Sequence, residues 1–341
     1  MSFLAVSGYI CTVIHDYTQS LMSWYRAYGR DLPWRGTRDA YAIWLSEIIL
    51  QQTRVQQGEA YWHRFLERFP TVEALAAASE DEVLRLWQGL GYYSRARNLH
   101  AAAKQVVAAG GFPKTLEGIR ALKGVGDYTA AAVASFAFDV DAAAVDGNVY
   151  RVLARHFGVE TPINTTEGKR EFTALATALL PPGQAATFNQ AMMDFGAVQC
   201  TPQRPSCLTC PVTDTCVALR TGRVDDLPVK LRKTKVQERR LAYIYIRCKQ
   251  ETAIRRRPAG DIWQGLWEPV ELSVLPTGLH GKLLAKDVKH VLTHRILYAD
   301  FYFLEVIEKP SLPEGYIWVR ESDLDDFAKP RLIERLLALV P

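Results

Sequence analysis

Four cysteines lie within seventeen residues, in the pattern Cys200-x6-Cys207-x2-Cys210-x5-Cys216. Thiolates this close together predict a soft metal centre, and both zinc sites and iron–sulfur clusters use four of them. Zinc sites usually pair their ligands as two Cys-x2-4-Cys knuckles, whereas only Cys207 and Cys210 form such a pair here. The spacing therefore leaves both metals open, with a modest preference for iron–sulfur.

Glu47 is a carboxylic acid in an apolar segment that predicts a helix from about Ala42 to Gln57. The apolar residues of this segment fall on one broad arc at helical spacing, and Glu47, Gln51 and Arg54 share the opposite stripe. A carboxylate on so apolar a helix is partly desolvated, which would raise its pKa. The alternative is a surface ion pair between Glu47 and Arg54.

Asp146 follows an apolar run and precedes a predicted helix that begins at Val149. An aspartate at this place can simply be the helix N-cap, which is a frequent structural role. Further upstream, Gly124-Val125-Gly126 separates a short predicted helix at 113–122 from a small-residue helix at 128–138. Glycines in such a turn let backbone N–H groups face a phosphate at the next helix's positive end. A tight turn between helices is the alternative.

The elements that must position these residues change character along the chain. Residues 12–220 have helical periodicity throughout, including a capping box that begins at Ser79. A basic stretch at 221–240 predicts a linker, either merely solvated or in contact with a polyanion. Residues 241–341 contain β-rich runs and two predicted helices, at 281–285 and 330–339. The fold class expected is a mostly α N-terminal region followed by an α+β domain.

Composition sets few further limits. The chain has 341 residues, enough for about two domains of roughly 150 residues, and its net charge of +4 is compatible with a polyanionic partner but does not require one. The N-terminus lacks the features of a signal peptide, so we expect an intracellular protein with reduced thiols. Cys11 and Cys248 are expected to be ordinary core residues.

Taken together, the motifs give the chain a recognisable pattern. The helical region, the glycine hairpin, the downstream aspartate and the cysteine spacing resemble the endonuclease III superfamily of DNA glycosylases. Within it, four segments resemble the MutY-type adenine DNA glycosylases, and the similarity extends over nearly the whole chain. These segments are Leu45–Thr53 (LSEIILQQT), Gly89–Tyr93 (GLGYY), Val145–Val149 (VDGNV) and Asn189–Gly196 (NQAMMDFG).

The resemblance implies a [4Fe–4S] cluster on Cys200, Cys207, Cys210 and Cys216, shaping a DNA-contacting loop rather than doing chemistry. It also implies a six-helix barrel with a helix–hairpin–helix at 115–138, and a cluster subdomain that includes 200–216. Phosphate binding is then expected at Gly124, Val125 and Gly126. Lys123 departs from the proline more usual in this turn.

The activity implied is cleavage of the N-glycosidic bond of adenine, which requires one acid and one carboxylate. Glu47 matches the family's general acid, and Asp146 matches the carboxylate that stabilises or bonds to the sugar cation. Bifunctional relatives carry a lysine where this chain has Tyr128, and a phenol cannot form an imine. We therefore expect a monofunctional enzyme in which Tyr128 and Asn148 support the transition state by hydrogen bonding.

To reach the catalytic residues, the base must be extruded from the duplex. The resemblance implies which residues contact the extruded adenine and the opposite base. Trp34, Arg35 and Gln190 would line the adenine pocket. Gln52 and Tyr92, with the neighbouring Leu90, would enter the stack around the opposite 8-oxoguanine.

The C-terminal domain resembles the family's Nudix-like recognition domain, without the Glu-rich metal-binding helix of an active Nudix hydrolase. Its Leu292-Thr293-His294 aligns with a Phe-Ser-His lesion-reading loop, so Thr293 and His294 keep the polar groups and the phenylalanine is lost. Thr293 as an ordinary strand residue is the alternative.

The expected partner is double-stranded DNA with an A:8-oxoguanine or A:G mispair, bound by a monomer that has no membrane association. Two rival functions follow from the same residues. One is a lyase-type glycosylase that acts on oxidised pyrimidines. The other is an iron–sulfur DNA-binding module with inert catalytic positions, against which Glu47 and Asp146 argue.

Overall fold

The computed structural model describes residues 3–231 and 236–341, with side chains from residue 15 onward. The chain forms two compact units: a first unit of Met1–Leu66 with Lys104–Arg232, and a second unit of Glu67–Ala103 with Lys233–Pro341. The predicted helical region contained 67–103, whereas this segment clusters with the C-terminal part of the chain. Residues 232–235 of the predicted linker lie outside the described residues, as does the side chain of Cys11.

The first unit is helical, as the sequence predicted. Its helices are α1 (Phe3–Tyr28), α2 (Ala40–Ile49), α3 (Val55–Arg68), α7 (Leu116–Arg120), α8 (Asp127–Phe138), α9 (Gly147–Phe157), α10 (Thr166–Leu179), α11 (Ala185–Asp194) and α12 (Val217–Arg220). Short helical turns are η1 (Pro33–Arg35), the π-helical η2 (Phe195–Gln199), η3 (Cys207–Thr209) and η4 (Thr213–Thr215). Two elements cross the unit boundary: α3, and α6 (Ser94–Ala108), which begins in the second unit.

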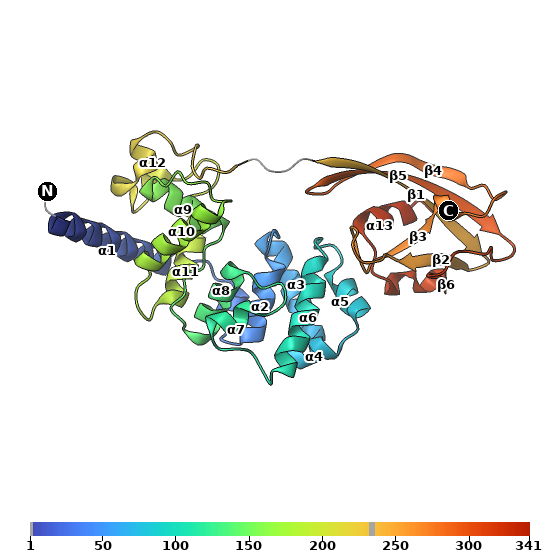
Figure 1. Ribbon diagram of the computed structural model, residues 1–341, viewed down its shortest axis with the longest axis horizontal. Helices are drawn as coiled ribbons and strands as arrows, with labels where there is room; N and C mark the ends of the chain where they lie inside the picture. The colour runs from blue at the N-terminus through green and yellow to red at the C-terminus, as the bar shows by residue number, and fades with distance from the viewer. Residues whose placement is uncertain (1–2, 232–235) are drawn as a thin grey trace. The chain divides into compact units, whose positions relative to one another are not determined.

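The core of the first unit forms where α1 meets α10 and α11, at one end of the bundle in Figure 1. Leu21, Leu153, Phe172 and Phe188 are fully or almost fully buried there. Each belongs to a different helix, so burial of their apolar area joins segments distant in the sequence. This packing fixes α8, α9 and α11, which carry Tyr128, Asn148 and Gln190 of the candidate site.

The helix predicted from Ala42 to Gln57 is wrong in its extent. It ends at Ile49, the chain turns, and α3 begins at Val55. All ten residues of α2 are buried, so it has no polar face of the kind that the helical wheel suggested. Glu47 therefore lies in the interior, and Gln51 and Arg54 lie in the turn.

The second unit contains one mixed sheet and the helices α4 (Val72–Ala77), α5 (Glu80–Trp87) and α13 (Arg331–Leu337). Ser79 caps α5 by accepting from the Glu82 N–H at 3.2 Å, which confirms the predicted cap. The sheet order is β4-β5-β1-β3-β2-β6, and among its pairs only β1 and β5 run parallel in the described residues. The strands are β1 (Gln237–Cys248), β2 (Glu251–Arg256), β3 (Trp267–Glu271), β4 (Lys282–Val291), β5 (Arg295–Val306) and β6 (Tyr316–Arg320), with turns η5 (Leu272–Val274) and η6 (Glu321–Asp326).

The two faces of β1 bury different cores. Tyr243 and Tyr245 pack with α13, against which the sheet lies in Figure 1, while Ile244 and Ile246 face the other side. Cys248 is buried at the end of this strand, as predicted. The helix predicted at 281–285 is wrong, because residues 282–285 belong to the edge strand β4, which pairs with β5.

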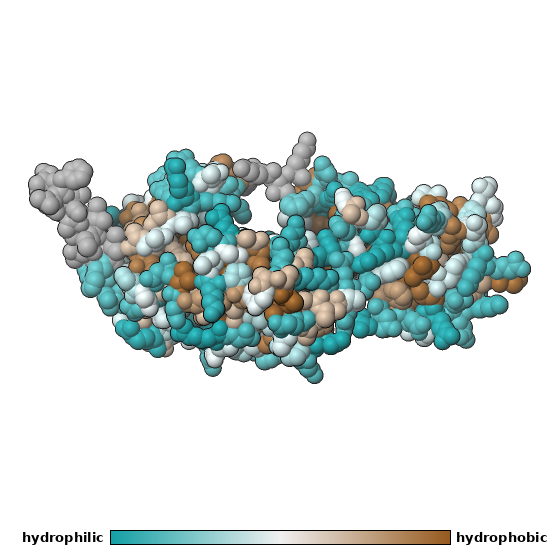
Figure 2. All heavy atoms as spheres, turned by 60° about the horizontal axis from the view of Figure 1, so that its bottom comes forward, coloured by the Kyte–Doolittle hydropathy of each residue, from teal (hydrophilic) through white to brown (hydrophobic). Residues whose placement is uncertain are grey.

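No helix in the described parts of the chain is both long enough and apolar enough to cross a membrane. The face drawn in Figure 2 is mostly hydrophilic, and its brown side chains gather only in small separate patches. Scattered apolar residues of this kind are normal on a protein surface.

Candidate active site

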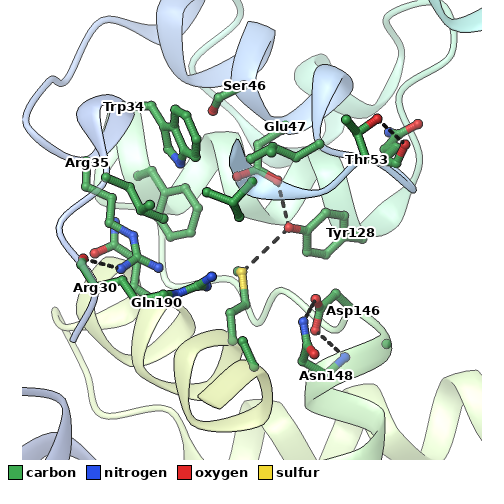
Figure 3. Close-up of a pocket in the computed structure, with 18 of the residues that line it drawn as sticks. Arg30, Trp34, Arg35, Ser46, Glu47, Thr53, Tyr128, Asp146, Asn148 and Gln190 are labelled. Carbon is green, nitrogen blue, oxygen red and sulfur yellow. Dashed lines mark hydrogen bonds between the residues drawn. The ribbon is translucent and has the colours of Figure 1, made fainter. Parts of the chain in front are cut away.

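A pocket of about 710 Å³ in the first unit brings together residues from five separate segments (Figure 3). All four residues predicted to be catalytic line it: Glu47, Tyr128, Asp146 and Asn148. So do four of those predicted to contact bases: Trp34, Arg35, Gln52 and Gln190. The remaining predicted substrate contacts lie in the second unit.

Glu47 is the buried acid of this pocket. The residue is 8% exposed, and its Oε2 accepts a hydrogen bond from the Tyr128 hydroxyl at 2.6 Å. Burial, with a smaller contribution from the nearby Asp146, raises the pKa of Glu47 to about 7, although the Tyr128 hydrogen bond and the Arg35 charge oppose the rise. The predicted rise in pKa is confirmed. Near neutral pH this carboxyl can therefore both donate and accept a proton.

Tyr128 stands in the first turn of α8, where its hydroxyl also lies 3.6 Å from the Met193 sulfur. Burial, followed by the negative charges of Glu47 and Asp146, raises its pKa well above the ordinary value. The phenol therefore remains a neutral hydrogen-bond donor over the working pH range of a protein.

Asp146 is the N-cap of α9, so the structural role considered from the sequence is real. Its Oδ1 accepts from the backbone N–H groups of Asn148 at 2.9 Å and Val149 at 2.8 Å, and its Oδ2 accepts from the Asn148 amide at 2.8 Å. Burial raises its pKa even though these hydrogen bonds oppose the rise. The same carboxylate also lines the pocket, so capping and a chemical role are compatible.

Arg151 ties this carboxylate region to the cysteine loop. Its Nη2 donates to Asn148 Oδ1 at 2.9 Å and to the Gly196 carbonyl at 2.7 Å, and its Nε donates to the Cys200 carbonyl at 2.9 Å. Gly196 can lie this close to Asn148 only because it has no side chain, since a Cβ there would lie 2.5 Å from the Asn148 Cβ. The sequence analysis missed Arg151, although its i, i+3 spacing from Asn148 places both on one face of a helix.

The four cysteines line a separate small pocket in the same unit. Arg155, one turn beyond Arg151 on α9, holds their loop by donating to the carbonyls of Thr201 at 2.7 Å and Pro202 at 3.0 Å. Its Nη1 also lies 3.6 Å from the Cys200 sulfur. Among the described residues, no group of three or more His, Cys, Asp or Glu side chains is placed to hold a single metal ion.

Arg35 and Gln190 form the polar side of the pocket across from Glu47 (Figure 3). Asp194, which is fully buried, accepts from both Nη atoms of Arg35 at 2.7 and 2.6 Å, and also from Arg30. Burial opposes its ionisation, yet these hydrogen bonds hold the pKa of Asp194 below its usual value. Asp194 was not singled out from the sequence, since nothing local marks it as the partner of Arg35.

The helix hairpin is present, with α7 and α8 joined by a turn at 121–126. Gly124 has φ of +75°, a conformation that favours glycine, whereas Gly126 is the N-cap of α8 with φ of −97°. No side chain caps α8, so the N–H groups of its first turn face outward with the positive end of the helix dipole. This arrangement can hold a phosphate at Gly124, Val125 and Gly126.

A second pocket, of about 790 Å³, lies within the second unit and gathers the remaining predicted contacts: Leu90, Tyr92, Thr293 and His294. The Tyr92 hydroxyl hydrogen-bonds Thr293 Oγ1, although 201 residues separate them. Tyr92 has φ of +46°, and Gln52, in the first unit, has φ of +57°. Non-glycine residues held in this region are strained and are typical of functional sites.

Comparison with known proteins gives the family. The model for the HhH-GPD superfamily of base excision DNA repair proteins matches residues 45–178, and the NUDIX domain model matches 242–339. An adenine DNA glycosylase of Buchnera aphidicola subsp. Schizaphis graminum is 32% identical over 257 residues, covering 74% of each chain. This chain belongs to the adenine DNA glycosylase family.

Other relatives differ in how much of their length is matched. Adenine DNA glycosylases of Mus musculus and Homo sapiens are 43% and 45% identical over 226 and 210 residues. These regions cover 62% and 58% of this chain, but only 44% and 38% of the mouse and human proteins. The chain thus spans less than half the length of these mammalian relatives.

Solved structures support the fold of the helical part. One, described as a thermostable thymine-DNA glycosylase, matches with a TM-score of 0.58 and 30% identity, over 62% of this chain and 98% of its own. An endonuclease III in a trapped covalent complex with DNA matches with a TM-score of 0.53 and 22% identity, over 60% and 94%. The latter likeness concerns the fold alone.

Proposed function

We propose that this protein is a monofunctional DNA glycosylase that removes adenine mispaired with 8-oxoguanine, or with guanine, from double-stranded DNA. The observation that carries the proposal is the buried Glu47 carboxyl, with a pKa of about 7, hydrogen-bonded to Tyr128 in one pocket with Asp146. Membership of the adenine DNA glycosylase family supports the choice of base.

In the proposed reaction, protonated Glu47 gives its proton to N7 of the extruded adenine. The electron pair of the C1′–N9 bond then leaves with the base, because protonation has made adenine a better leaving group. A water molecule loses a proton to the Glu47 carboxylate and adds to C1′. The products are free adenine and an abasic site, and Glu47 is protonated again.

Asp146 stabilises the positive charge that develops on the sugar, or bonds to it transiently. Asn148 supports this role, since its side-chain and backbone N–H groups fix both carboxylate oxygens of Asp146. Because burial raises the free energy of the ionised carboxylate, a cation formed beside it is strongly favoured.

Tyr128 replaces the amine that a lyase would need at this position. Its phenol can donate a hydrogen bond to Glu47 but cannot form an imine with the sugar. Borohydride should therefore trap no efficient covalent adduct on DNA that the protein has processed. An efficient adduct would favour the lyase function instead.

Each unit holds residues with a proposed role in base recognition. Trp34, Arg35 and Gln190 would contact adenine, while Gln52, Leu90, Tyr92, Thr293 and His294 would read the opposite 8-oxoguanine. The left-handed backbone of Gln52 and Tyr92 supports a functional role for both. Gly124, Val125 and Gly126 would bind a phosphate of the DNA backbone.

Cys200, Cys207, Cys210 and Cys216 would hold a [4Fe–4S] cluster. Their four thiols line one pocket, and the Arg155 Nη1 lies 3.6 Å from the Cys200 sulfur, where its charge would offset that of the thiolates. Membership of the adenine DNA glycosylase family supports the cluster over zinc, a choice that the cysteine spacing alone leaves open. When bound, the cluster would hold the loop and α9 in place and supply no group for glycosidic cleavage. Iron and sulfide should be lost in Cys207→Ser and kept in Cys248→Ser.

The test of the proposed function is base release by the purified protein under single-turnover conditions, on A:8-oxoguanine, A:G and A:C duplexes. We expect fastest release of adenine from A:8-oxoguanine and slowest from A:C. Release of an oxidised pyrimidine, with no release of adenine, would contradict the proposal.

A further inference from the structure

Tyr25 of α1 lies behind two residues of the adenine side of the pocket. Its hydroxyl donates a hydrogen bond to Gln190 Oε1 at 2.8 Å, and its ring centroid lies 5.8 Å from the Arg35 guanidinium carbon. Gln190 and Arg35 both line the pocket. Tyr25 thus touches the residues that would face the base and can act only through them.

The chain holds Tyr25 in this place and keeps its hydroxyl a donor. Gly29 closes the end of α1 against the ring, where a Cβ would lie 2.7 Å from Tyr25 Cε2 and from the Tyr25 carbonyl oxygen. Burial raises the pKa of Tyr25; Arg35 opposes this rise and Asp194 adds to it. The phenol is therefore protonated at the pH at which the pocket works.

Arg35 has little freedom, because its two Nη atoms donate three hydrogen bonds, two to Asp194 and one to the Arg30 carbonyl. Gln190 is different. The two ends of its amide have nearly the same shape, one a donor and one an acceptor, so a half-turn would exchange what the pocket offers. A phenol is a better hydrogen-bond donor than acceptor, so the Tyr25 hydroxyl favours the state in which Gln190 Oε1 faces it and the amide nitrogen faces the pocket.

We propose that Tyr25 is a positioning residue for base specificity, which turns the Gln190 amide nitrogen toward the extruded base so that it reads an acceptor at N1. This inference rests on the proposed function. Gln190 comes from the side of the pocket across from Glu47, which would serve N7, so it meets a different edge of the purine (Figure 3).

The chemistry of the purines makes this orientation selective. Adenine and unsubstituted purine both have an unprotonated N1, which accepts from an amide N–H. Hypoxanthine carries a proton on N1, as guanine does. Its N1–H donor would therefore face the amide N–H donor of Gln190. Such a mismatch leaves two polar groups unpaired in a buried site, which is costly. A fixed Gln190 would therefore protect 6-oxopurines from excision.

The experiment compares Tyr25→Phe with wild type on duplexes that place adenine, purine or hypoxanthine opposite 8-oxoguanine. Single-turnover rates are measured for each base. Without the hydroxyl the amide can turn, so we expect adenine and purine release to slow by about tenfold, the effect of roughly one hydrogen bond. Hypoxanthine release should be unchanged or faster. Tyr28→Phe is the matched control on the same helix, since Tyr28 is 67% exposed, and it should change none of the rates.

Each other outcome overturns the inference. Equal slowing of all three bases would mean that Tyr25 only supports the fold, and no slowing would mean that it does not position Gln190. In a Gln190→Leu background, Tyr25→Phe should have no further effect; an undiminished effect would show that Tyr25 acts through another group. A wild-type protein that releases none of these bases would instead overturn the proposed function, and this inference with it.

Discussion

The Tyr128 hydroxyl donates to Glu47 Oε2 at 2.6 Å, so the phenol that would replace the lysine of a lyase is hydrogen-bonded directly to the proposed acid. This hydrogen bond favours the ionised carboxylate, while burial favours the protonated one. Burial is the larger effect, and the balance leaves the pKa of Glu47 at about 7. One residue would thus prevent imine formation and adjust the pKa of the proposed acid.

Replacing Tyr128 with Phe should change the pH profile in a defined direction. The acid must be protonated to act, so the rate of base release falls as pH rises through the pKa of Glu47. Loss of the hydrogen bond removes an effect that lowers this pKa. We therefore expect the descending limb to move to higher pH in single-turnover profiles, with a lower maximal rate. A limb that moves to lower pH would contradict the assigned hydrogen bond.

Asp146→Asn separates the cap from the chemistry. Asparagine is as good an N-cap as aspartate and keeps the two backbone hydrogen bonds, but the Asn148 amide loses its acceptor, so the free energy of unfolding should fall by no more than about 1–2 kcal/mol. The negative charge beside the sugar is lost, however, and base release should fall by at least about 100-fold. Urea unfolding and single-turnover kinetics on the same preparation check both parts. Retained activity would mean that Asp146 is only a cap.

Arg151→Lys tests the link between α9 and the cysteine loop. Lysine keeps the charge but cannot reach Asn148, Gly196 and Cys200 with one planar fork. We expect base release to slow by about tenfold with little change in the affinity for duplex DNA. Arg38→Lys, in an exposed ion pair of the same unit, is the control. A loss confined to DNA affinity would argue against a role in positioning Asn148 and Asp146.

The contact between Tyr92 and Thr293 predicts coupling in lesion reading. Tyr92→Phe and Thr293→Val each remove one partner of the same hydrogen bond. Each should lower the preference for A:8-oxoguanine over A:G, and the double variant should be little worse than either single one. The ratio of single-turnover rates on the two duplexes measures this preference. Additive effects would mean that the two hydroxyls act independently.

Most residues of the candidate site lie in short contiguous motifs, which is why the sequence could point to them. Glu47, Asp146 and the cysteines could be found in this way, and the raised pKa of Glu47 followed from the apolar residues around it. The contact between Tyr25 and Gln190 joins residues 165 positions apart, and no local pattern marks such a pair. The same holds for Arg151 and the Cys200 carbonyl, 49 positions apart.

Errors in the predicted fold have similar causes. The segment 281–285 has residues that suit a helix, but pairing with β5 makes residues 282–285 part of a strand, so tertiary contacts override local propensity. Helical periodicity continues through 50–54, where the chain in fact turns between α2 and α3. The turn gives Gln52 its left-handed backbone, and strain of this kind is typical of functional positions.

The most direct test of the central claim is adenine release from an A:8-oxoguanine duplex by Glu47→Gln, compared with wild type under single-turnover conditions. Glutamine has nearly the same shape but cannot give up a proton at neutral pH. With folding checked by circular dichroism and DNA affinity by titration, we expect release to fall by about 100-fold to 10,000-fold. Release at the wild-type rate would contradict the account, because the buried acid would then have no part in the reaction.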